Sequence, residues 1–365
     1  MTDKVEKSGR GSIVELERPA LELALAERGH DRFRARQIFR WIYRRGVATF
    51  DAMTNLPRAL RQTLESDFDF PTPAIVSRER SADLTEKFLL PLADGRRIES
   101  VFIPDTPANT FCVSTQVGCA MACAFCLTGK MGLVRNLTAG EIVGQVRVLA
   151  GVLGLRDKPF NVVLMGMGEP LHNYDETMKA LRILADSEGC ALPPRRVTLS
   201  TVGLLPALER LAHEPLMPNL AISLHAPTDA LRGELVPINT KYGIADIIEA
   251  CKRFPLKKRA RITFEYVLLA GVNDRPDEAR KLAKLLAGVK SKVNLIPLNA
   301  APGIPFERPR DAAIDRFAKI LAERGLTVSV RKSRGRDIRA ACGQLIVEGE
   351  RRSPAQQLAS LAFGN

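Results

Sequence analysis

The chain has 365 residues and a formal charge of +13, from 54 Lys and Arg against 41 Asp and Glu. Hydrophobic residues make up 45% of the chain, which excludes an intrinsically disordered protein. A chain of this length and composition can bury a full hydrophobic core. No apolar run approaches the roughly 18 residues of a membrane span, and the opening segment lacks the apolar centre of a signal peptide. We therefore expect a cytoplasmic protein without a membrane partner. The positive charge favours a polyanion as partner, although an ordinary basic enzyme would share this composition.

The N-terminal segment is predicted to form short helices over residues 20–67. Between residues 32 and 45, apolar side chains suited to the buried stripe of a helix alternate with arginines suited to its outer face. The apolar residues are Phe33, Ile38, Trp41 and Ile42, and the arginines are Arg32, Arg34, Arg36, Arg40, Arg44 and Arg45. With the overall charge, this pattern favours an RNA-binding accessory domain over residues 1–80. The alternative is an ordinary solvated helix face.

A hairpin is predicted next, over residues 86–103. Two runs rich in β-forming residues flank the dipeptide Asp94-Gly95, which is typical of a tight hairpin turn. We assign residues 81–110 to this hairpin and its linkers.

From residue 111 onward the pattern changes to strands that alternate with helices. The predicted strands are 111–117, 161–166, 196–201, 219–224, 262–269 and 293–298, and the predicted helices are 138–151, 174–187, 204–213, 244–253, 276–288 and 310–324. Six such units in series predict an α/β fold with a parallel sheet, here an open, partial (β/α)6 TIM-like barrel over residues 111–345. Its active site is expected at the carboxyl ends of the strands. Residues 327–332 add a last strand, and residues 346–365 form a C-terminal tail.

Three cysteines follow the first predicted barrel strand. Cys119, Cys123 and Cys126 have the spacing C-x3-C-x2-C. A cubane iron–sulfur cluster is held by cysteine thiolates, and three of them leave one of its irons open to a substrate. A structural zinc site usually has a fourth Cys or His close by, and none of the four His lies within 40 residues. The segment therefore predicts a [4Fe–4S] cluster rather than zinc, a four-cysteine ferredoxin cluster or three core cysteines.

Distinctive residues also stand where four other predicted strands end. They are Gly168 and Glu169 after the second strand, Ser200 at the third, Ser223, Leu224 and His225 at the fourth, and Asn299 after the sixth. Each alone suits a turn or a helix cap. Because the carboxyl ends of parallel strands meet at one end of the barrel, their joint position favours a ligand pocket.

The cysteine segment, with Phe125 before its last cysteine, resembles the signature of the radical S-adenosylmethionine (SAM) superfamily. In that superfamily the open iron binds the amino and carboxylate groups of SAM. The segment that ends in Gly168 and Glu169 resembles the motif whose backbone and carboxylate meet the SAM amino group. The resemblance implies a radical SAM barrel that binds SAM through the residues at its strand ends.

Two further cysteines narrow this resemblance. Cys112 stands in Phe-Cys-Val-Ser-Thr-Gln-Val-Gly-Cys, and Cys342 in Arg-Ala-Ala-Cys-Gly-Gln-Leu. Both segments resemble the RlmN/Cfr family of RNA adenine methyltransferases, and the likeness runs from the N-terminal helical region to Cys342. The overall form is closest to the RlmN branch, which methylates adenine C2 in 23S rRNA at the peptidyl-transferase centre and in tRNA beside the anticodon.

The resemblance also implies a mechanism that uses two SAM molecules per turnover. One methylates the thiolate of Cys342. The other is cleaved to a 5′-deoxyadenosyl radical, which takes a hydrogen from that methyl group, and the methylene radical then adds to adenine C2. Glu99 accepts the C2 proton, and attack by Cys112 releases the product and leaves a Cys112–Cys342 disulfide.

Each of these residues also has an ordinary interpretation. Cys112 suits a buried strand residue, Cys342 a loop thiol, and Glu99 a surface charge on the hairpin. Cys190 and Cys251 match no motif and are expected to be structural. Two basic clusters are expected to contact phosphates. They comprise Lys257, Lys258, Arg259 and Arg261 before the fifth strand, and Arg331, Lys332, Arg334, Arg336 and Arg339 before Cys342.

Two alternatives remain for the whole chain. Methylation at adenine C8, the Cfr-type reaction, shares every motif named above. A protein that only binds RNA could instead use Cys119, Cys123 and Cys126 to hold a structural metal ion. If the chain is an enzyme of this family, the resemblance further implies an electron donor such as flavodoxin and a monomeric protein.

Overall fold

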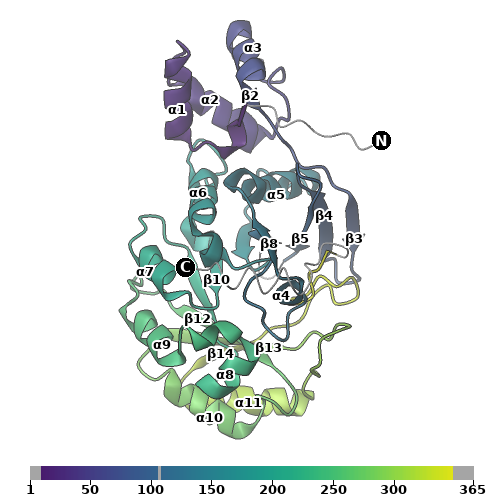
Figure 1. Cartoon of the computed structure of the whole chain (residues 1–365), viewed down its shortest axis with the longest axis vertical. Helices are drawn as coiled ribbons and strands as arrows, with labels where there is room; N and C mark the ends of the chain where they lie inside the picture. The colour runs from purple at the N-terminus through teal and green to yellow at the C-terminus, as the bar shows by residue number, and fades with distance from the viewer. Residues whose placement is uncertain (1–9, 106–107, 348–365) are drawn as a thin grey trace. The chain divides into compact units, whose positions relative to one another are not determined.

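The computed structural model describes residues 10–105 and 108–347, and these residues divide into two compact units (Figure 1). The helical unit joins the N-terminal segment up to Ala74 to residues 138–159 and 175–193. The sheet unit takes residues 75–137, 160–174 and those from 194 on. From residue 348 on, the predicted tail lies outside the described residues. No helix among the described residues is long and apolar enough to cross a membrane.

The helical unit is built from short helices and one two-stranded pairing. Its elements are β1 (Gly11–Ser12), α1 (Arg18–Glu27), α2 (Arg34–Phe39), α3 (Arg58–Asp67), β2 (Phe68–Asp69), α5 (Ala139–Val152) and most of α6 (Tyr174–Ala185). α5 begins with a capping box, in which Thr138 accepts from the Glu141 amide and Glu141 accepts from the Thr138 amide. The buried Arg147 of α5 donates to the carbonyls of Val47 and Pro71 and so joins α5 to the N-terminal segment.

The arginine-rich segment after α1 is helical, as predicted. α2 continues into a π-helical turn over residues 40–45, which ends at Gly46 in the left-handed conformation with φ 67°. Ile38, Trp41 and Ile42 are buried as predicted, but Phe33 is 50% exposed. The prediction for Phe33 was wrong because α2 begins only at Arg34, so Phe33 precedes the helix and lies outside its apolar stripe.

The sheet unit holds one ten-stranded mixed sheet in the order β14-β13-β12-β11-β10-β9-β6-β5-β4-β3. In this sheet β6 and the strands from β9 to β14 pair in parallel, whereas β3, β4, β5 and β6 pair antiparallel. The strands are β3 (Ser77–Arg80), β4 (Glu86–Pro91), β5 (Arg97–Ile103), β6 (Thr110–Cys112), β9 (Asn161–Leu164), β10 (Val197–Thr201), β11 (Asn219–Ser223), β12 (Ile262–Leu268), β13 (Ser291–Pro297) and β14 (Thr327–Val330). The predicted α/β fold, its open sheet and the β4–β5 hairpin are confirmed.

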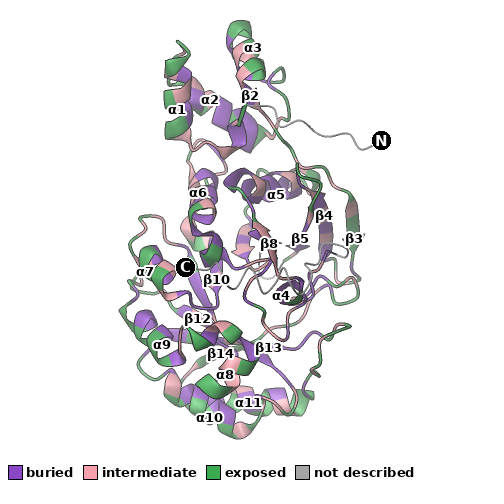
Figure 2. Ribbon diagram, viewed as in Figure 1, coloured by how far each residue is buried: buried purple, intermediate pink, exposed green. Residues whose placement is uncertain are grey.

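Helices alternate with these strands, as the sequence pattern predicts. Those of the sheet unit are α4 (Leu127–Met131), α7 (Leu205–Ala212), α8 (Asp229–Leu235), α9 (Ile244–Arg253), α10 (Pro276–Leu285) and α11 (Asp311–Glu323). The inner strands β5 and β12 are almost wholly buried, so that the sheet forms the centre of this unit (Figure 2). The short helices α4 and α8 were not predicted, because each spans less than two turns and shows little periodicity.

The predicted strand 111–117 is wrong in one respect, because it is two strands in different sheets. β6 ends at Cys112, and β7 (Gln116–Gly118) pairs instead with β8 (Leu133–Asn136). The chain between them is held by Ser114, whose hydroxyl donates to the Glu99 carbonyl and accepts from the Met167 amide. These bonds take the backbone out of the large sheet and direct it toward the three cysteines.

Candidate active site

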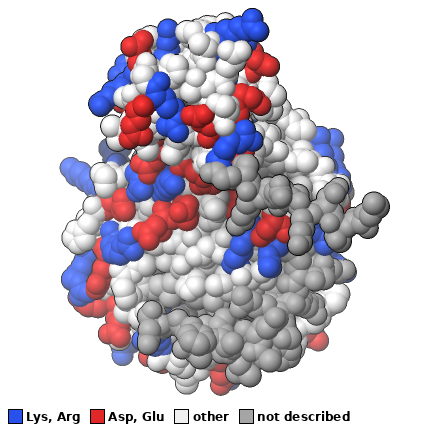
Figure 3. Space-filling view, turned by 45° about the horizontal axis from the view of Figure 1, so that its top comes forward, with Lys and Arg blue, Asp and Glu red and all other residues white. Residues whose placement is uncertain are grey.

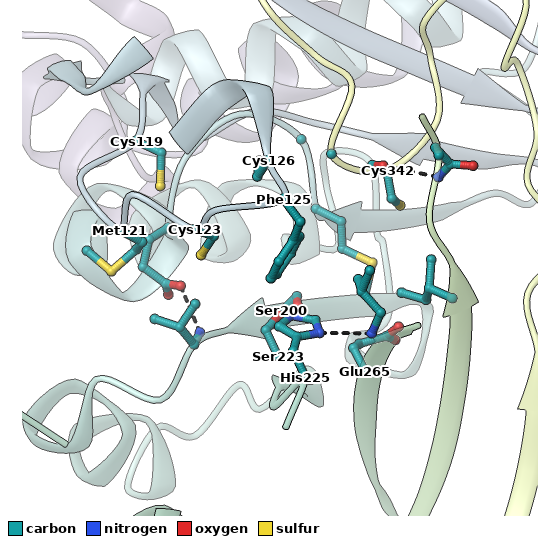
Figure 4. A pocket seen from close by; sticks show the side chains of 18 of the residues that line it. Cys119, Met121, Cys123, Phe125, Cys126, Ser200, Ser223, His225, Glu265 and Cys342 are labelled. Atoms are coloured by element: carbon teal, nitrogen blue, oxygen red, sulfur yellow. Dashed lines mark hydrogen bonds between the residues drawn. The ribbon is translucent and has the colours of Figure 1, made fainter. Parts of the chain in front are cut away.

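The loop after β7 brings the three predicted cluster cysteines to one pocket of the sheet unit (Figure 4). Gly118, just before Cys119, has φ +76°, and a Cβ atom there would collide with the Gly132 carbonyl oxygen. That position therefore requires glycine. Within the loop the Cys126 amide donates to the Cys123 carbonyl at 3.1 Å. The loop is also bonded to its surroundings, since the Ala124 amide donates to the Leu235 carbonyl at 3.0 Å.

The donor set of this loop fits an iron–sulfur cluster. Cys119, Cys123 and Cys126 all line the pocket, and burial raises the pKa of each thiol. A bound metal displaces such protons, because the thiolate is the form that ligates. Among the described residues no three His, Cys, Asp or Glu side chains converge on a single metal ion. The fit therefore rests on the chemistry of three cysteine donors beside an open pocket.

The carboxyl ends of the strands supply the rest of the pocket. Of the residues predicted there, those that line it are Gly168, Glu169, Ser200, Ser223, His225 and Asn299. Leu224 is fully buried and does not line it. The Ser200 and Ser223 hydroxyls lie 3.3 Å apart on the adjacent strands β10 and β11. The parallel register thus gathers residues that are far apart in sequence.

Glu169 holds two loops while it lines the pocket. One carboxylate oxygen accepts from the Leu171 amide at 3.0 Å, and the other accepts from the Val202 amide at 2.9 Å. Burial raises the pKa of Glu169 to about 7. Gly168 beside it has φ +105°, and a Cβ atom there would collide with Gln116.

His225 lines the pocket as a neutral side chain that is held in place by a hydrogen bond. Its Nδ1 atom accepts from the Val267 amide at 3.1 Å, and its ring meets the edge of Phe125 at a centroid distance of 4.7 Å. Burial lowers the pKa of His225 to about 3, so the ring carries no charge at neutral pH. With φ 63°, His225 also adopts a backbone conformation that is uncommon outside glycine.

A fully buried arginine, which the sequence did not single out, supports these strand ends. The Arg232 guanidinium donates to the carbonyls of Val202 at 2.6 Å and Leu224 at 3.1 Å. It therefore ties the end of β10 to the end of β11. Sequence reasoning missed Arg232 because α8, which carries it, was not recognised.

Cys342 and Cys112 meet in a second, smaller cavity that adjoins the main pocket. Cys342 lines both cavities, as do Asn299 and Arg331, whereas Cys112 lines only the smaller one. The Asn299 amide donates to the Cys342 carbonyl at 3.1 Å. Burial raises the pKa of Cys112 to about 12. All seven cysteines are free thiols, so the disulfide implied by the resemblance is absent from this structure.

The segment around Cys342 is bonded directly to α4, the helix that follows the three cysteines. The Gly343 carbonyl accepts from the Leu127 amide at 2.8 Å, and the Leu345 carbonyl accepts from the Thr128 hydroxyl at 2.6 Å. Residues separated by more than 200 positions are thereby held side by side. Cys342 thereby lies at the pocket of the three cysteines, which it also lines.

Glu99 belongs to the same region and is not a surface charge, since it is only 5% exposed. It lies two residues before Val101 on β5, and Val101 pairs directly with Cys112 of β6. Alternate strand residues share a face, so Glu99 and Cys112 lie on one face of the sheet. The Glu99 carboxylate accepts from the Ile346 amide at 2.8 Å and so reaches the Cys342 segment.

The predicted basic clusters separate in space. Lys258, Arg259 and Arg261 line a surface crevice with Lys290, next to the amino ends of β12 and β13 and away from the pocket at the carboxyl ends. Of the second cluster, Arg331 lines the main pocket, whereas the others lie outside it. Basic and acidic side chains are interspersed on the face shown in Figure 3.

The two remaining cysteines are not among the residues that line the site. Cys251 is buried in α9 of the sheet unit, and Cys190 lies in the helical unit. Neither lines the pocket of the three cysteines or the cavity of Cys112. Their structural interpretation agrees with this placement.

Comparison with known proteins identifies the family. Residues 113–285 match the radical SAM superfamily model, and residues 12–69 match the model for the ribosomal RNA large subunit methyltransferase N-terminal domain. The chain is 47% identical to a dual-specificity RNA methyltransferase RlmN of Anaeromyxobacter dehalogenans, over 93% of each chain. It is 50% identical to the RlmN of Geobacter sulfurreducens, over 92% of this chain and 90% of that one.

A solved structure agrees with these sequence relatives. The crystal structure of a radical SAM methyltransferase from Sphaerobacter thermophilus superimposes with a TM-score of 0.88 at 48% identity, over 92% of this chain and 99% of that one. The predicted radical SAM fold is therefore confirmed, and the N-terminal helical segment is part of the family pattern. The chain belongs to the RlmN family of the radical SAM superfamily.

Proposed function

We propose that this chain is an RNA methyltransferase that methylates adenine C2 in 23S rRNA and in tRNA. The observation that carries the proposal is the convergence of Cys112, Cys342 and Glu99 beside the pocket of the three cysteines. A protein that only binds RNA has no use for two unpaired thiols and a buried carboxylate at that place. The relatives named dual-specificity RNA methyltransferase support RNA methylation, and the family model that matches residues 12–69 is named for ribosomal RNA of the large subunit.

The superfamily uses a [4Fe–4S] cluster and SAM, and the pocket has residues suited to both. Cys119, Cys123 and Cys126 would hold the cluster. The residues that would bind SAM are Gly168, Glu169, Ser200, Ser223, His225 and Asn299. When bound, the cluster and SAM supply a 5′-deoxyadenosyl radical by one-electron cleavage of SAM. We further propose an electron donor such as flavodoxin, a monomeric enzyme and a cytoplasmic location.

The other residues of the site would carry the methyl group and the proton. Cys342 would accept the methyl group on its sulfur, and once that group has lost a hydrogen atom to the 5′-deoxyadenosyl radical, its carbon would bond to adenine C2. Glu99 would accept the proton that C2 must lose, and the unpaired electron left on the adduct would return to the cluster. Cys112 attacks the Cys342 sulfur, so that an S–S bond forms and the S–C bond breaks. The electron pair of the broken bond goes to the methylene carbon, which takes up a proton and becomes the methyl group of the product.

Product analysis tests this reaction. The holoenzyme, reduced and supplied with SAM, is expected to convert adenosine in 23S rRNA fragments and in tRNA to 2-methyladenosine. Nuclease digestion and mass spectrometry against authentic standards measure the product. A yield of 8-methyladenosine would move the chain to the Cfr-type reaction. RNA binding without any methylated nucleoside from fully loaded enzyme would favour the binding protein.

For the helical segment over residues 1–80 we propose RNA binding through phosphate contacts. Arg32 and Arg36 are exposed, whereas Arg40 is ion-paired with Glu188 at 2.6 Å. Arg32→Gln with Arg36→Gln is expected to weaken tRNA binding and lower the slope of log affinity against log salt by roughly 1 per lost contact. Binding titrations with tRNA at several salt concentrations measure both the affinity and this slope. Arg40→Gln is the matched control, and an equal effect there would favour a solvated helix face.

A further inference from the structure

The Glu99 carboxylate lies in a protected environment that disfavours its ionised form. It is 5% exposed, and this burial raises its pKa. A carboxyl group can accept a proton only while it is ionised. The position therefore needs something that stabilises the negative charge.

Lys87 is the cation at this carboxylate. Its Nζ atom lies 3.1 Å from Glu99 Oε1, and its side chain is 11% exposed. Among the described residues no other cation forms an ion pair with Glu99. An opposite charge at this distance in a buried site favours ionisation far more than it would in water.

The strand register explains why Lys87 reaches this position. Lys87 of β4 pairs with Val101 of β5, and Val101 pairs with Cys112 of β6. Directly paired residues share a face of the sheet, and Glu99 shares it too because it lies two residues from Val101. Lys87 thus lies on the sheet face that carries both Glu99 and Cys112. A shift of one residue in this register would turn Lys87 to the opposite face.

The charged and hydrogen-bonding groups around the Glu99 carboxylate come from three elements. β4 contributes the Lys87 ammonium, and β3 contributes Glu79, which lies 3.3 Å from the same ammonium and is half-exposed. The C-terminal segment contributes the Ile346 amide, which also stabilises the ionised form. Glu79 opposes ionisation of Glu99, since its charge is of the same sign. Lys87 is therefore the charged group on which the ionised state of Glu99 depends.

We propose that Lys87 is a positioning residue that keeps Glu99 ionised and aimed at the adenine bound beside Cys342. This role rests on the proposed function, in which Glu99 accepts the C2 proton. Lys87 itself transfers no proton and touches no substrate in this role. Its removal therefore slows proton removal at neutral pH but leaves the earlier attachment of RNA to Cys342 intact.

The test compares Lys87→Met with Lys87→Arg in the loaded enzyme. Without the ammonium the pKa of Glu99 rises further, so the rising limb of product formation against pH moves to higher pH by about 1–3 units. At neutral pH, Lys87→Met accumulates an RNA-linked enzyme band on a denaturing gel. A jump to higher pH releases the RNA as methylated product. Lys87→Arg keeps the charge and restores most of the wild-type profile.

Arg80→Met is the matched control. Arg80 lies on β3 of the same sheet edge and interacts with Glu86, on the face opposite to Lys87. Its removal takes away a cation without touching Glu99, and the wild-type pH profile is expected. An equal shift in Arg80→Met would show a general effect of charge or of hairpin stability and would overturn the proposal.

A second readout does not depend on turnover. Difference infrared spectroscopy during a pH titration reports the protonated Glu99 carboxyl, assigned by its loss in Glu99→Gln. In Lys87→Met this signal is expected to persist to higher pH than in the wild type. An unchanged titration overturns the role of Lys87 even if Glu99 is the proton acceptor. If Glu99→Gln forms product normally, Glu99 is not the acceptor, and this part of the proposed function fails together with the role of Lys87.

Discussion

Cys112→Ala is expected to leave the enzyme covalently attached to its RNA. In the proposed mechanism Cys342 makes the carbon bridge to adenine, and that step does not need the second thiol. Breaking the bond between the Cys342 sulfur and the bridging carbon does need one, and Cys112 is the thiol that lines the same cavity. A denaturing gel should therefore show an RNA-linked protein band that collapses on nuclease digestion, while product formation falls to background.

The burial of Cys112 sharpens this expectation. Burial raises the pKa of its thiol to about 12, so the neutral thiol predominates at neutral pH. A premature attack on SAM by this sulfur is thereby disfavoured, whereas Cys342 lines the pocket where SAM would bind. The two thiols thus have different environments that suit two different tasks.

Two controls separate this mechanism from loss of a core residue. Adding Cys342→Ala should remove the RNA-linked band, because the bridging sulfur is gone. Cys251→Ala removes an equally buried thiol from α9, and it should turn over normally without a band. A folded, fully loaded Cys112→Ala enzyme that still methylates at the wild-type rate would reject the two-cysteine mechanism.

Much of this fold could be predicted because its signals are local. Each parallel strand is a short apolar run, and each helix repeats apolar residues at helical spacing, so both are visible in windows of a few residues. The signal of the predicted cluster site is equally local, because Cys119, Cys123 and Cys126 fall within eight consecutive positions of the chain. The position of the ligand pocket then followed from the rule that the carboxyl ends of parallel strands meet at one end of the barrel.

The features that escaped prediction depend on contacts between distant residues. In the sequence Lys87 looks like an ordinary surface lysine of the hairpin. Only the pairing of β4 with β5 shows that it shares a sheet face with Glu99. Arg232 lies on α8, a helix too short to show a helical pattern in the sequence. Its partners are backbone carbonyls, which have no counterpart in the sequence either. The division into two units was also hidden, because residues 138–159 and 175–193 belong by sequence pattern to the barrel but pack with the N-terminal helices.

Replacing any of Cys119, Cys123 or Cys126 by Ala is expected to abolish iron loading and reductive SAM cleavage. Each would supply one of three thiolates, and the pocket that they line offers no further cysteine except Cys342, to which the proposed mechanism gives another role. Iron and sulfide content, visible absorption that dithionite bleaches, and release of methionine and 5′-deoxyadenosine measure the loss. All three signals should fall to background in each single variant.

The same experiment decides between the enzyme and the metal-stabilised binding protein. Cys190→Ala is the matched control, since Cys190 lies in the helical unit and lines neither cavity, and it should load iron as the wild type does. A structural zinc site would give a colourless wild-type protein, and its loss would show as lower thermal stability without any change in visible absorption. An iron-loaded variant of all three cysteines that still cleaved SAM would contradict the cluster site. The expected result is a brown wild type, a brown Cys190→Ala protein and colourless variants at Cys119, Cys123 and Cys126, because those three cysteines would supply the thiolates that hold the cluster.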